Sequence, residues 1–254
     1  MTYEAQRLEI CQVGKLLYDR GYVVSNDGNL SLRVAPDRLL VTPSGVSKGR
    51  LTPDMLLVTD LEGNVLEGNR HPSSETKMHL AVYRGRPDVG AVFHAHPPVS
   101  TAFAVCRRGM ETPYLSELVT GLGAVPCTPS FAMLSTDEVP RSVEPYLADH
   151  CAVLLANHGA LTWGRSAMEA YYRMESLELW AKITINAVIL GGSHDISREN
   201  IQKLIDLRGF YRVTGRHPGY KKYDNGLRRN HAERYPRHPL PRAVKGAGGD
   251  GPWR

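Results

Sequence analysis

The chain has 254 residues, of which 42% are hydrophobic, and it carries a formal net charge of +5 at pH 7. This length and composition fit one domain with a hydrophobic core, and no apolar run reaches the roughly 18 residues that a membrane span needs. The mixed charge of the first ten residues is unlike the apolar stretch of a signal peptide, so we expect a soluble cytoplasmic protein.

Positive charge is concentrated towards the C-terminal end. Residues 212–254 hold 11 Lys/Arg and 3 Asp/Glu, whereas the rest of the chain holds 20 basic and 23 acidic residues. We therefore expect a mildly acidic folded domain at 1–211, followed by a basic, Gly/Pro-rich extension at 212–254. Because the basic charge belongs to the extension, we do not expect nucleic acid as a partner.

The first quarter of the chain predicts a helix and then a series of hairpins. Apolar positions recur at helical spacing over residues 4–20. Strands are expected at 30–34 and 38–42, and a hairpin runs from residue 55 to residue 66 around the turn at 62–64. Since hairpins join these strands, we expect a largely antiparallel central sheet.

Small polar residues and glycines fill the loops at 25–29 and 43–47. Both loops are able to present backbone N–H groups and hydroxyls to a phosphate. Most such clusters are merely turns, so alone they are weak evidence for a binding site.

Residues 72–98 place a carboxylate and two histidines in one helix-and-strand unit. Ser73 and Ser74 are typical helix-starting residues, and Pro87 ends the predicted helix. Glu75 is expected in its first turn, where backbone N–H groups favour an anion.

The buried strand predicted over residues 89–93 leads into His94 and His96, which a two-residue period points to one face. A single histidine is more often an ordinary polar residue than a metal ligand. A third histidine, His158, follows a second buried-strand run at 151–156. Three histidines leave a coordination position open, which is the pattern of a catalytic zinc site.

The second half of the chain predicts further helices and strands. Ser166 and Glu169 have the spacing of a capping box and open the longest helix, which continues to about Ile189. The remaining expected elements are a helix at 98–107, a segment at 113–119 that fits strand or helix, a short strand near 124–125 and a helix at 136–149.

Five motifs together resemble the class II aldolase/adducin family, most closely its L-fuculose-1-phosphate aldolase-like branch. They occur in the family's order and spacing, and the resemblance covers about residues 5–208. The resemblance implies a three-layer α/β/α fold, a homotetramer and active sites between neighbouring subunits. The motifs are Gly28-Asn29-Leu30-Ser31, Pro43-Ser44-Gly45, Pro72-Ser73-Ser74-Glu75, His94-Ala95-His96 and Asn157-His158-Gly159.

The resemblance also assigns roles to individual residues. It implies that His94, His96 and His158 hold a divalent ion, usually zinc in this family, with manganese or cobalt as alternatives. Glu75 is implied to be the catalytic acid/base. The phosphate of the substrate would be surrounded by Asn26, Asn29, Ser44, Gly45, Ser73 and Ser74.

The activity implied is cleavage of a ketose 1-phosphate to dihydroxyacetone phosphate and an aldehyde, with a substrate of the fuculose, 5-deoxyribulose or 5-methylthioribulose type. The last two types would place the enzyme in nucleoside salvage. One position departs from the pattern, because Leu115 stands where fuculose aldolases present a tyrosine from the neighbouring subunit. We expect the adjacent Tyr114, or Glu117, to take over that catalytic role.

Other branches of the family remain alternatives. The same histidines serve methylthioribulose-1-phosphate dehydratases and ribulose-phosphate 4-epimerases, and a further branch decarboxylates sugar acids. Glu75 favours an aldolase over an epimerase, whose branch tends to carry Asp there. A non-catalytic, adducin-like binding module is the alternative of a different class, and the presence of all three histidines and Glu75 argues against it.

Overall fold

The computed structural model describes residues 2–210, and the predicted extension at 212–254 lies outside this range. Seven strands of the described chain form one sheet in the order β4-β3-β2-β1-β5-β7-β6, and every neighbouring pair is antiparallel. The antiparallel sheet expected from the hairpins is therefore confirmed. The strands are β1 (Asn29–Ala35), β2 (Arg38–Val41), β3 (Leu57–Thr59), β4 (Val65–Glu67), β5 (Ala91–Ala95), β6 (Ala152–Leu155) and β7 (Gly159–Gly164).

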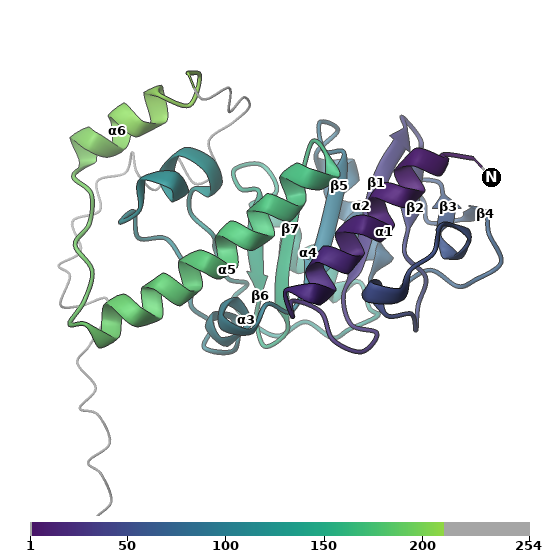
Figure 1. Ribbon diagram of the computed structural model, residues 1–254, viewed down its shortest axis with the longest axis horizontal. Coiled ribbons are helices and arrows are strands. Elements are labelled where there is room, and N and C mark those ends of the chain that lie inside the picture. Colours follow the sequence, from purple (N-terminus) through teal and green to yellow (C-terminus); the bar gives the residue numbers. More distant parts are fainter. Residues whose placement is uncertain (1, 211–254) are drawn as a thin grey trace, which may run out of the picture.

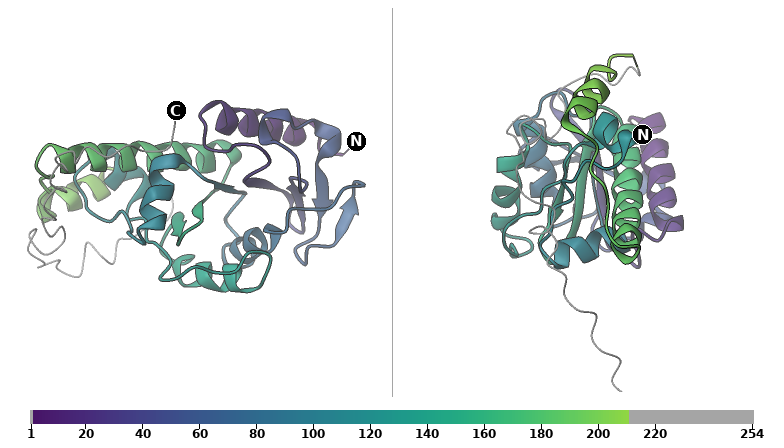
Figure 2. Two further views of the ribbon diagram at one scale, coloured as in Figure 1. Left: turned by 90° about the horizontal axis from the view of Figure 1, so that it is seen from below. Right: turned by 90° about the vertical axis from the view of Figure 1, so that its left-hand side faces the viewer.

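Helices cover both faces of the sheet, which confirms the three-layer arrangement (Figures 1 and 2). The long helices α1 and α5 lie over one face together with α3, and α2 and α4 lie over the other. The described helices are α1 (Glu4–Asp19), α2 (Thr76–Gly85), α3 (Pro98–Val105), α4 (Glu138–Val143), α5 (Ala167–Ile189) and α6 (Arg198–Asp206).

Each face of the sheet has its own hydrophobic core. Leu30 and Phe93 point into the core under α1 and α5, whereas Val92, the neighbour of Phe93, points into the core under α2 and α4. This alternation is the two-residue period of a strand that is buried on both sides. The central strands β1 and β5 are therefore held firmly between two apolar layers, and the candidate site lies at one end of them.

Two boundaries near the site differ from the expectation. Strand β5 spans Ala91–Ala95 rather than residues 89–93, so His94 lies inside the strand. Helix α2 begins at Thr76, and Glu75 is the residue before the helix rather than part of its first turn. Ser73 accounts for this shift, because its carbonyl accepts the Thr76 N–H at 3.0 Å and its hydroxyl accepts the Glu75 N–H at 3.3 Å.

The middle of the chain is less regular than expected. The ambiguous segment becomes a short π-helix at Leu118–Leu122, and the short strand expected near residues 124–125 is a single bridge between Met110 and Val125. The helix expected at 136–149 is shortened to α4 and a 3₁₀ turn, because Pro145 has no N–H to continue the helix.

The serine half of the predicted capping box is present at the start of α5. The Ser166 hydroxyl accepts a hydrogen bond from the Glu169 N–H at 3.2 Å. The Glu169 carboxylate accepts from the Arg165 N–H at 2.7 Å, one residue earlier than an ideal box.

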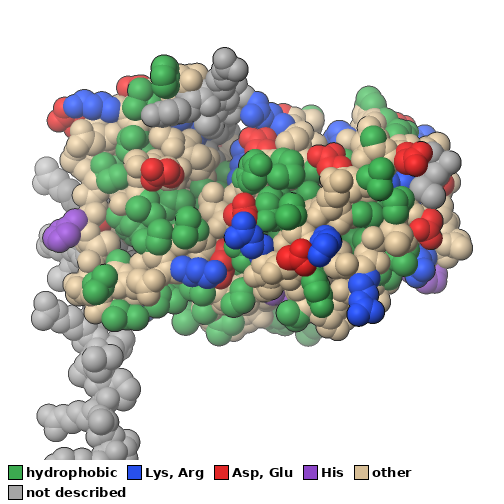
Figure 3. Space-filling model, in the orientation of Figure 1, with side chains coloured by type: hydrophobic (Ala, Val, Ile, Leu, Met, Phe, Trp, Pro, Cys, Tyr) green, Lys and Arg blue, Asp and Glu red, His purple; other side chains and the backbone are tan. Residues whose placement is uncertain are grey.

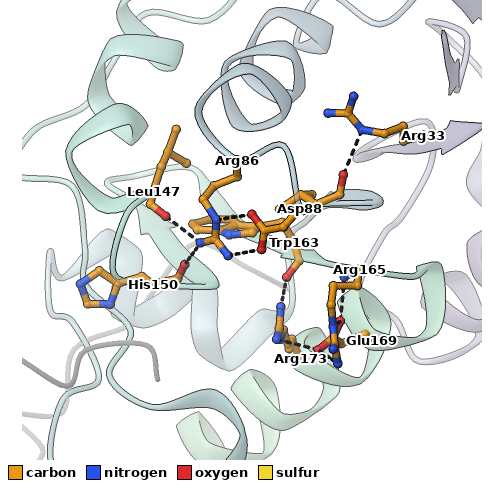
Figure 4. A network of polar contacts seen from close by, with 10 residues as sticks. Arg33, Arg86, Asp88, Leu147, His150, Trp163, Arg165, Glu169 and Arg173 are labelled. Carbon is orange, nitrogen blue, oxygen red and sulfur yellow. Dashed lines mark hydrogen bonds and ion pairs between the residues drawn. The ribbon is translucent and has the colours of Figure 1, made fainter. Parts of the chain in front are cut away.

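Two ion pairs lie at the end of the sheet where β5 begins and β7 ends (Figure 4). Arg86 pairs with Asp88 at 2.7 Å and donates to the Leu147 carbonyl at 2.8 Å. Arg173 donates to the Trp163 carbonyl and pairs with Glu169 at 2.8 Å. We call this end of β5 and β7, with its two ion pairs, the arginine end of the sheet. The histidines lie at the opposite end of the same two strands, which we call the histidine end.

The outer surface of α1 and α5 carries exposed apolar side chains, including Leu16, Tyr172, Leu179 and Ile185, and Figure 3 shows hydrophobic side chains gathered on this face. No described helix is long and apolar enough to cross a membrane.

Candidate active site and metal centre

Three histidines from separate parts of the chain meet at one end of the sheet. His94 comes from β5, His96 from just beyond it, and His158 from the turn between β6 and β7. Their candidate ligand nitrogens all lie within 4.8 Å of one another. The Nε2 atoms of His94 and His96 are 3.1 Å apart. The structure thus brings together the three residues that the sequence singled out.

The backbone around this group explains the glycine of the third motif. Asn157 adopts a left-handed conformation with φ of 57°, which turns the chain between β6 and β7. A Cβ atom at Gly159 would lie 2.5 Å from the His96 ring and 3.2 Å from the His94 ring. Only glycine leaves room for both imidazoles beside the start of β7.

The second ring nitrogen of two histidines faces an oxygen of this chain. His94 Nδ1 lies 2.9 Å from the Ala160 carbonyl, so Nδ1 carries the proton and Nε2 keeps its lone pair. His96 Nδ1 lies 3.6 Å from the Asp27 carboxylate. Oxygen partners of this kind orient metal-binding histidines and raise their basicity. Asp27 was not predicted from the sequence, where its only signal was its place in the loop at 25–29.

The histidines are neutral at pH 7. Burial lowers the pKa of His158 to about 4 and lowers the pKa of His94 well below its usual value. Burial also lowers the pKa of His96, and the nearby Asp27 carboxylate partly offsets this. Neutral imidazoles are the form that binds a metal. Three imidazole nitrogens this close together suit zinc and similar divalent ions and leave a coordination position open.

The Glu75 carboxylate lies directly against the histidines. Its two oxygens are 3.2 Å from His158 Nε2 and 3.5 Å from His94 Nε2. The Asn29 amide donates to it at 2.8 Å. Burial raises the pKa of Glu75, Asp27 raises it further, and the Asn29 hydrogen bond and the Lys48 charge oppose these effects. A carboxyl group with a raised pKa holds its proton more strongly than an ordinary one, which suits a residue that donates a proton.

The three loops proposed for phosphate lie side by side. Pro43 and Pro72 form an isolated bridge, and the Ser73 N–H donates to the Thr42 carbonyl at 3.3 Å, so the motifs at 43–45 and 72–75 are adjacent. Asn29 joins them through Glu75. Two of the predicted residues, Asn26 and Gly45, line a surface hollow together with Tyr18, Ser25, Ser47 and Arg50. Ser44 and Ser74 lie on the same adjacent motifs.

A buried lysine that was not predicted from the sequence connects two of these loops. Lys48 is only 2% exposed, and its ammonium group donates to the Asn26 carbonyl at 2.9 Å and to the Val46 carbonyl at 2.6 Å. Burial lowers its pKa to about 8, although Asp27 and Glu75 favour the charged form. The only sequence signal for Lys48 was its position next to the loop at 43–47.

Tyr114 and Glu117 occupy a different part of the chain. The Tyr114 hydroxyl contacts Thr184 of α5, and its ring packs edge-on against Trp180 with ring centres 6.1 Å apart. Glu117 precedes the π-helix and accepts a hydrogen bond from the Ser116 hydroxyl at 2.9 Å. Within one copy of the chain, Tyr114 lies against α5 and Glu117 lies at the π-helix. Their catalytic roles on another copy of the chain stay predictions.

Comparison with known proteins gives a consistent family and several activities. The chain is 35% identical over 188 residues to a 3-oxo-tetronate 4-phosphate decarboxylase of Haemophilus influenzae, covering 72% of this chain and 88% of that protein. It is 33% identical over 186 residues to a methylthioribulose-1-phosphate dehydratase of Methylococcus capsulatus, covering 69% and 91%. A solved L-fuculose 1-phosphate aldolase superposes with a TM-score of 0.75 at 29% identity, covering 81% and 97%.

The sequence model of the class II aldolase and adducin N-terminal domain matches residues 8–185. This range contains the three histidines, Glu75 and all three loops, and the relatives of known activity are lyases that act on sugar phosphates or related phosphorylated acids. The chain belongs to the class II aldolase/adducin family.

Proposed function

We propose that this protein is a metal-dependent aldolase that cleaves a ketose 1-phosphate of the fuculose, 5-deoxyribulose or 5-methylthioribulose type to dihydroxyacetone phosphate and an aldehyde. One observation carries the proposal. The Glu75 carboxyl, whose pKa is raised by burial, lies 3.2 and 3.5 Å from two of the three clustered histidines. A proton-transfer group therefore stands beside a site that is built to hold a Lewis acid.

In this proposal His94, His96 and His158 hold a zinc ion, with manganese or cobalt as alternatives. The neutral histidines and the open coordination position fit such an ion. When bound, the ion supplies Lewis-acid stabilisation of negative charge that develops on substrate oxygens. This makes a Schiff-base lysine unnecessary.

The residues of the chain then have separate tasks. The loops that carry Asn26, Asn29, Ser44, Gly45, Ser73 and Ser74 bind the phosphate and fix the position of the ketose. When the C3–C4 bond breaks, its electron pair stays on C3, and the C4 hydroxyl loses its proton as the aldehyde forms. Glu75 donates a proton to C3, which gives dihydroxyacetone phosphate, and is reprotonated afterwards.

The proton of the C4 hydroxyl needs an acceptor, and we assign this role to Tyr114 or Glu117 of a neighbouring subunit. A homotetramer with active sites between subunits would bring these residues to another copy's histidines. The exposed apolar side chains on α1 and α5 support an assembly of this kind. Light scattering of the purified protein tests the tetramer, which we expect in the cytoplasm.

A decarboxylase is the second candidate, because the relative at 35% identity carries that activity. Loss of carbon dioxide from 3-oxo-tetronate 4-phosphate leaves an electron pair on the carbon that becomes the hydroxymethyl group of dihydroxyacetone phosphate. Glu75 would protonate that carbon as it does after the retro-aldol cleavage. The two candidates therefore share one half of the reaction and differ in the leaving group.

A panel of substrates separates these activities. The zinc-loaded or manganese-loaded protein is offered fuculose, rhamnulose, 5-deoxyribulose and 5-methylthioribulose 1-phosphates and 3-oxo-tetronate 4-phosphate. We expect dihydroxyacetone phosphate and an aldehyde from at least one ketose 1-phosphate. Release only from the keto acid, with carbon dioxide, would replace the aldolase by the decarboxylase. Formation of a dehydrated product, without cleavage, from 5-methylthioribulose 1-phosphate would indicate a dehydratase.

A further inference from the structure

Polar side chains follow the face of β1 that points towards α2, where the surrounding core is apolar. Three strand residues two positions apart face three residues four positions apart, the first just before α2 and the other two within it, and hydrogen bonds join the two rows at each level. We call this row the polar seam. It consists of Asn29, Ser31 and Arg33 on β1 and of Glu75, at the start of α2, with His79 and Tyr83 within it.

The two periods match closely enough to keep this row in register. Two residues of a strand advance about 6.6 Å, and four residues of a helix advance about 6.0 Å. A strand and a helix that run in the same direction therefore present successive partners to each other over three levels. The seam thus depends on the matching rise of strand and helix as well as on the polar residues at these positions.

The contacts of the seam are short and directional. At the first level Asn29 donates to Glu75 at 2.8 Å. At the second level the Ser31 hydroxyl lies 2.6 Å from His79 Nδ1 and 2.9 Å from the Tyr83 hydroxyl. At the third level the Arg33 guanidinium donates to the Tyr83 carbonyl at 3.1 Å and lies 5.0 Å from the centre of its ring.

The second level is completely enclosed. Ser31 is 0%, Tyr83 1% and His79 2% exposed, and burial lowers the pKa of His79 to about 3, so its ring is neutral. Polar groups in such a place carry a desolvation cost that apolar side chains would not have. Their hydrogen bonds offset part of this cost, since His79 Nε2 has no hydrogen-bond partner among the described residues, and these bonds also fix geometry in a way that apolar contacts do not.

The other contacts of α2 are mostly apolar packing, with two exposed polar contacts, from Lys77 to Asp137 and from Arg84 to the Leu61 carbonyl. Met78, Leu80 and Val82 pack into the core between α2, α4 and the sheet. Hydrophobic burial is non-directional, so a small slide or rotation of the helix changes this packing energy little. The polar seam supplies the buried, directional contacts between α2 and the sheet, and with the Ser73 hydrogen bond to the Glu75 N–H it specifies where Glu75 stands relative to the histidines.

We propose that Ser31 and His79 are positioning residues for the reaction, because they hold α2 in the register that places the Glu75 carboxyl against the histidines. The inference rests on the proposed role of Glu75 as acid/base. Neither residue contacts the substrate in this account, and both act through Glu75. A misplacement of about 1 Å at a catalytic group can cost up to roughly 100-fold in rate.

Two substitutions test the seam. Ser31→Ala removes one hydroxyl from the second level, and His79→Leu removes the imidazole while keeping a buried side chain. For each variant kcat, KM, bound metal and thermal stability are measured with the best substrate of the panel. We expect kcat to fall about 10-fold for Ser31→Ala, and at least as far for His79→Leu, with KM and metal content unchanged. The double variant should lose less than the product of the two single losses, because both act on one contact.

Val143→Ala is the matched control. Val143 lies on α4 and belongs to the same core as α2, but it is not part of the seam. It should lower stability as much as the seam variants while leaving kcat within twofold. Equal losses of kcat in the control would show that general packing of α2, rather than the seam, positions Glu75, and would overturn the proposal.

Glu75→Gln separates this inference from the proposed function. If Glu75→Gln lowers kcat and the folded, metal-loaded seam variants do not, the seam proposal is wrong and the role of Glu75 stands. If Glu75→Gln leaves kcat unchanged, both assignments are wrong, because nothing then needs positioning.

Discussion

The two ends of strands β5 and β7 differ in whether their buried charged and polar groups have partners within the chain. At the arginine end, Arg86 and Arg173 are each paired with a carboxylate at 2.7–2.8 Å and also donate to a carbonyl. At the histidine end, Glu75 faces neutral imidazoles. Two buried oxygens there, Glu75 Oε1 and Asn29 Oδ1, have no hydrogen-bond partner in the described chain. A buried polar atom without a partner is costly unless a ligand or ion satisfies it.

This difference indicates that one end of the sheet contributes mainly to stability and the other mainly to the site. The arginine end satisfies its own charges and therefore contributes to stability. The histidine end has buried polar atoms without partners among the described residues, which in the proposed function are left for the metal and the substrate. Substitutions at the two ends should accordingly affect different measurements.

The largest effect is expected from removal of a metal ligand. His94→Ala should abolish bound zinc, measured by metal analysis, and lower turnover at least about 1,000-fold, because Lewis-acid stabilisation is lost. His150→Ala is the control, since His150 lies beside the arginine end and donates to the Ala124 carbonyl. Retention of metal by His94→Ala would contradict the assignment of the site.

Glu75→Gln should lower kcat by about 100-fold or more while the metal stays bound. The amide keeps the size of the side chain but cannot transfer a proton. Glu62→Gln, at an exposed turn, serves as the control and should leave kcat unchanged. An unaltered rate in Glu75→Gln would remove Glu75 from the chemistry.

Lys48→Met should raise KM for a sugar phosphate about 10-fold and leave kcat nearly unchanged. The substitution removes the hydrogen bonds that join the loops of Asn26 and Val46, and a buried cation near the proposed phosphate. Lys15→Met, on the exposed surface of α1, should have no such effect. If both variants bind the sugar phosphate as the wild type does, the loops need no support from Lys48.

At the arginine end, Arg86→Met should lower the free energy of unfolding by about 1–3 kcal/mol and leave kcat unchanged. The variant leaves Asp88 and the Leu147 carbonyl without their donor. Chemical denaturation measures the first quantity and the substrate assay the second. A large loss of kcat without loss of stability would contradict the division between the two ends.

The pH dependence of stability offers the smallest of these effects. Because burial lowers the pKa of Lys48 from 10.5 to about 8, the unfolded chain binds more protons than the folded chain between pH 8 and 10.5. The free energy of unfolding should therefore gain about 1–2 kcal/mol from this group as the pH rises to 9.5. This gain should be missing in Lys48→Met. Parallel pH profiles of the two proteins would show that Lys48 titrates normally.

The candidate site could be predicted from the sequence where short motifs determine local geometry. His94 lies in β5 and His96 just beyond its end, His158 directly precedes β7, and Glu75 follows Ser73 and Ser74, so each motif carries its own placement. The antiparallel sheet was likewise readable, since hairpin turns impose it.

The parts that the sequence did not predict depend on contacts between distant segments. Lys48 and Asp27 are ordinary charged residues until the fold buries one and places the other beside His96. The π-helix at Leu118–Leu122 forms in a stretch with no clear period, and Pro145 shortened the helix expected before β6. The roles proposed for Tyr114 and Glu117 rest on contacts with a second copy of the chain, which short motifs in one sequence do not determine.

The most direct test of the proposed chemistry does not require the correct aldehyde. Dihydroxyacetone phosphate is incubated in deuterium oxide with the zinc-loaded protein, and exchange of one hydrogen of its hydroxymethyl group is followed by proton NMR. The account predicts exchange by the wild type and at least about 100-fold slower exchange by Glu75→Gln. Absence of exchange in folded, metal-loaded wild type to which dihydroxyacetone phosphate demonstrably binds would contradict it.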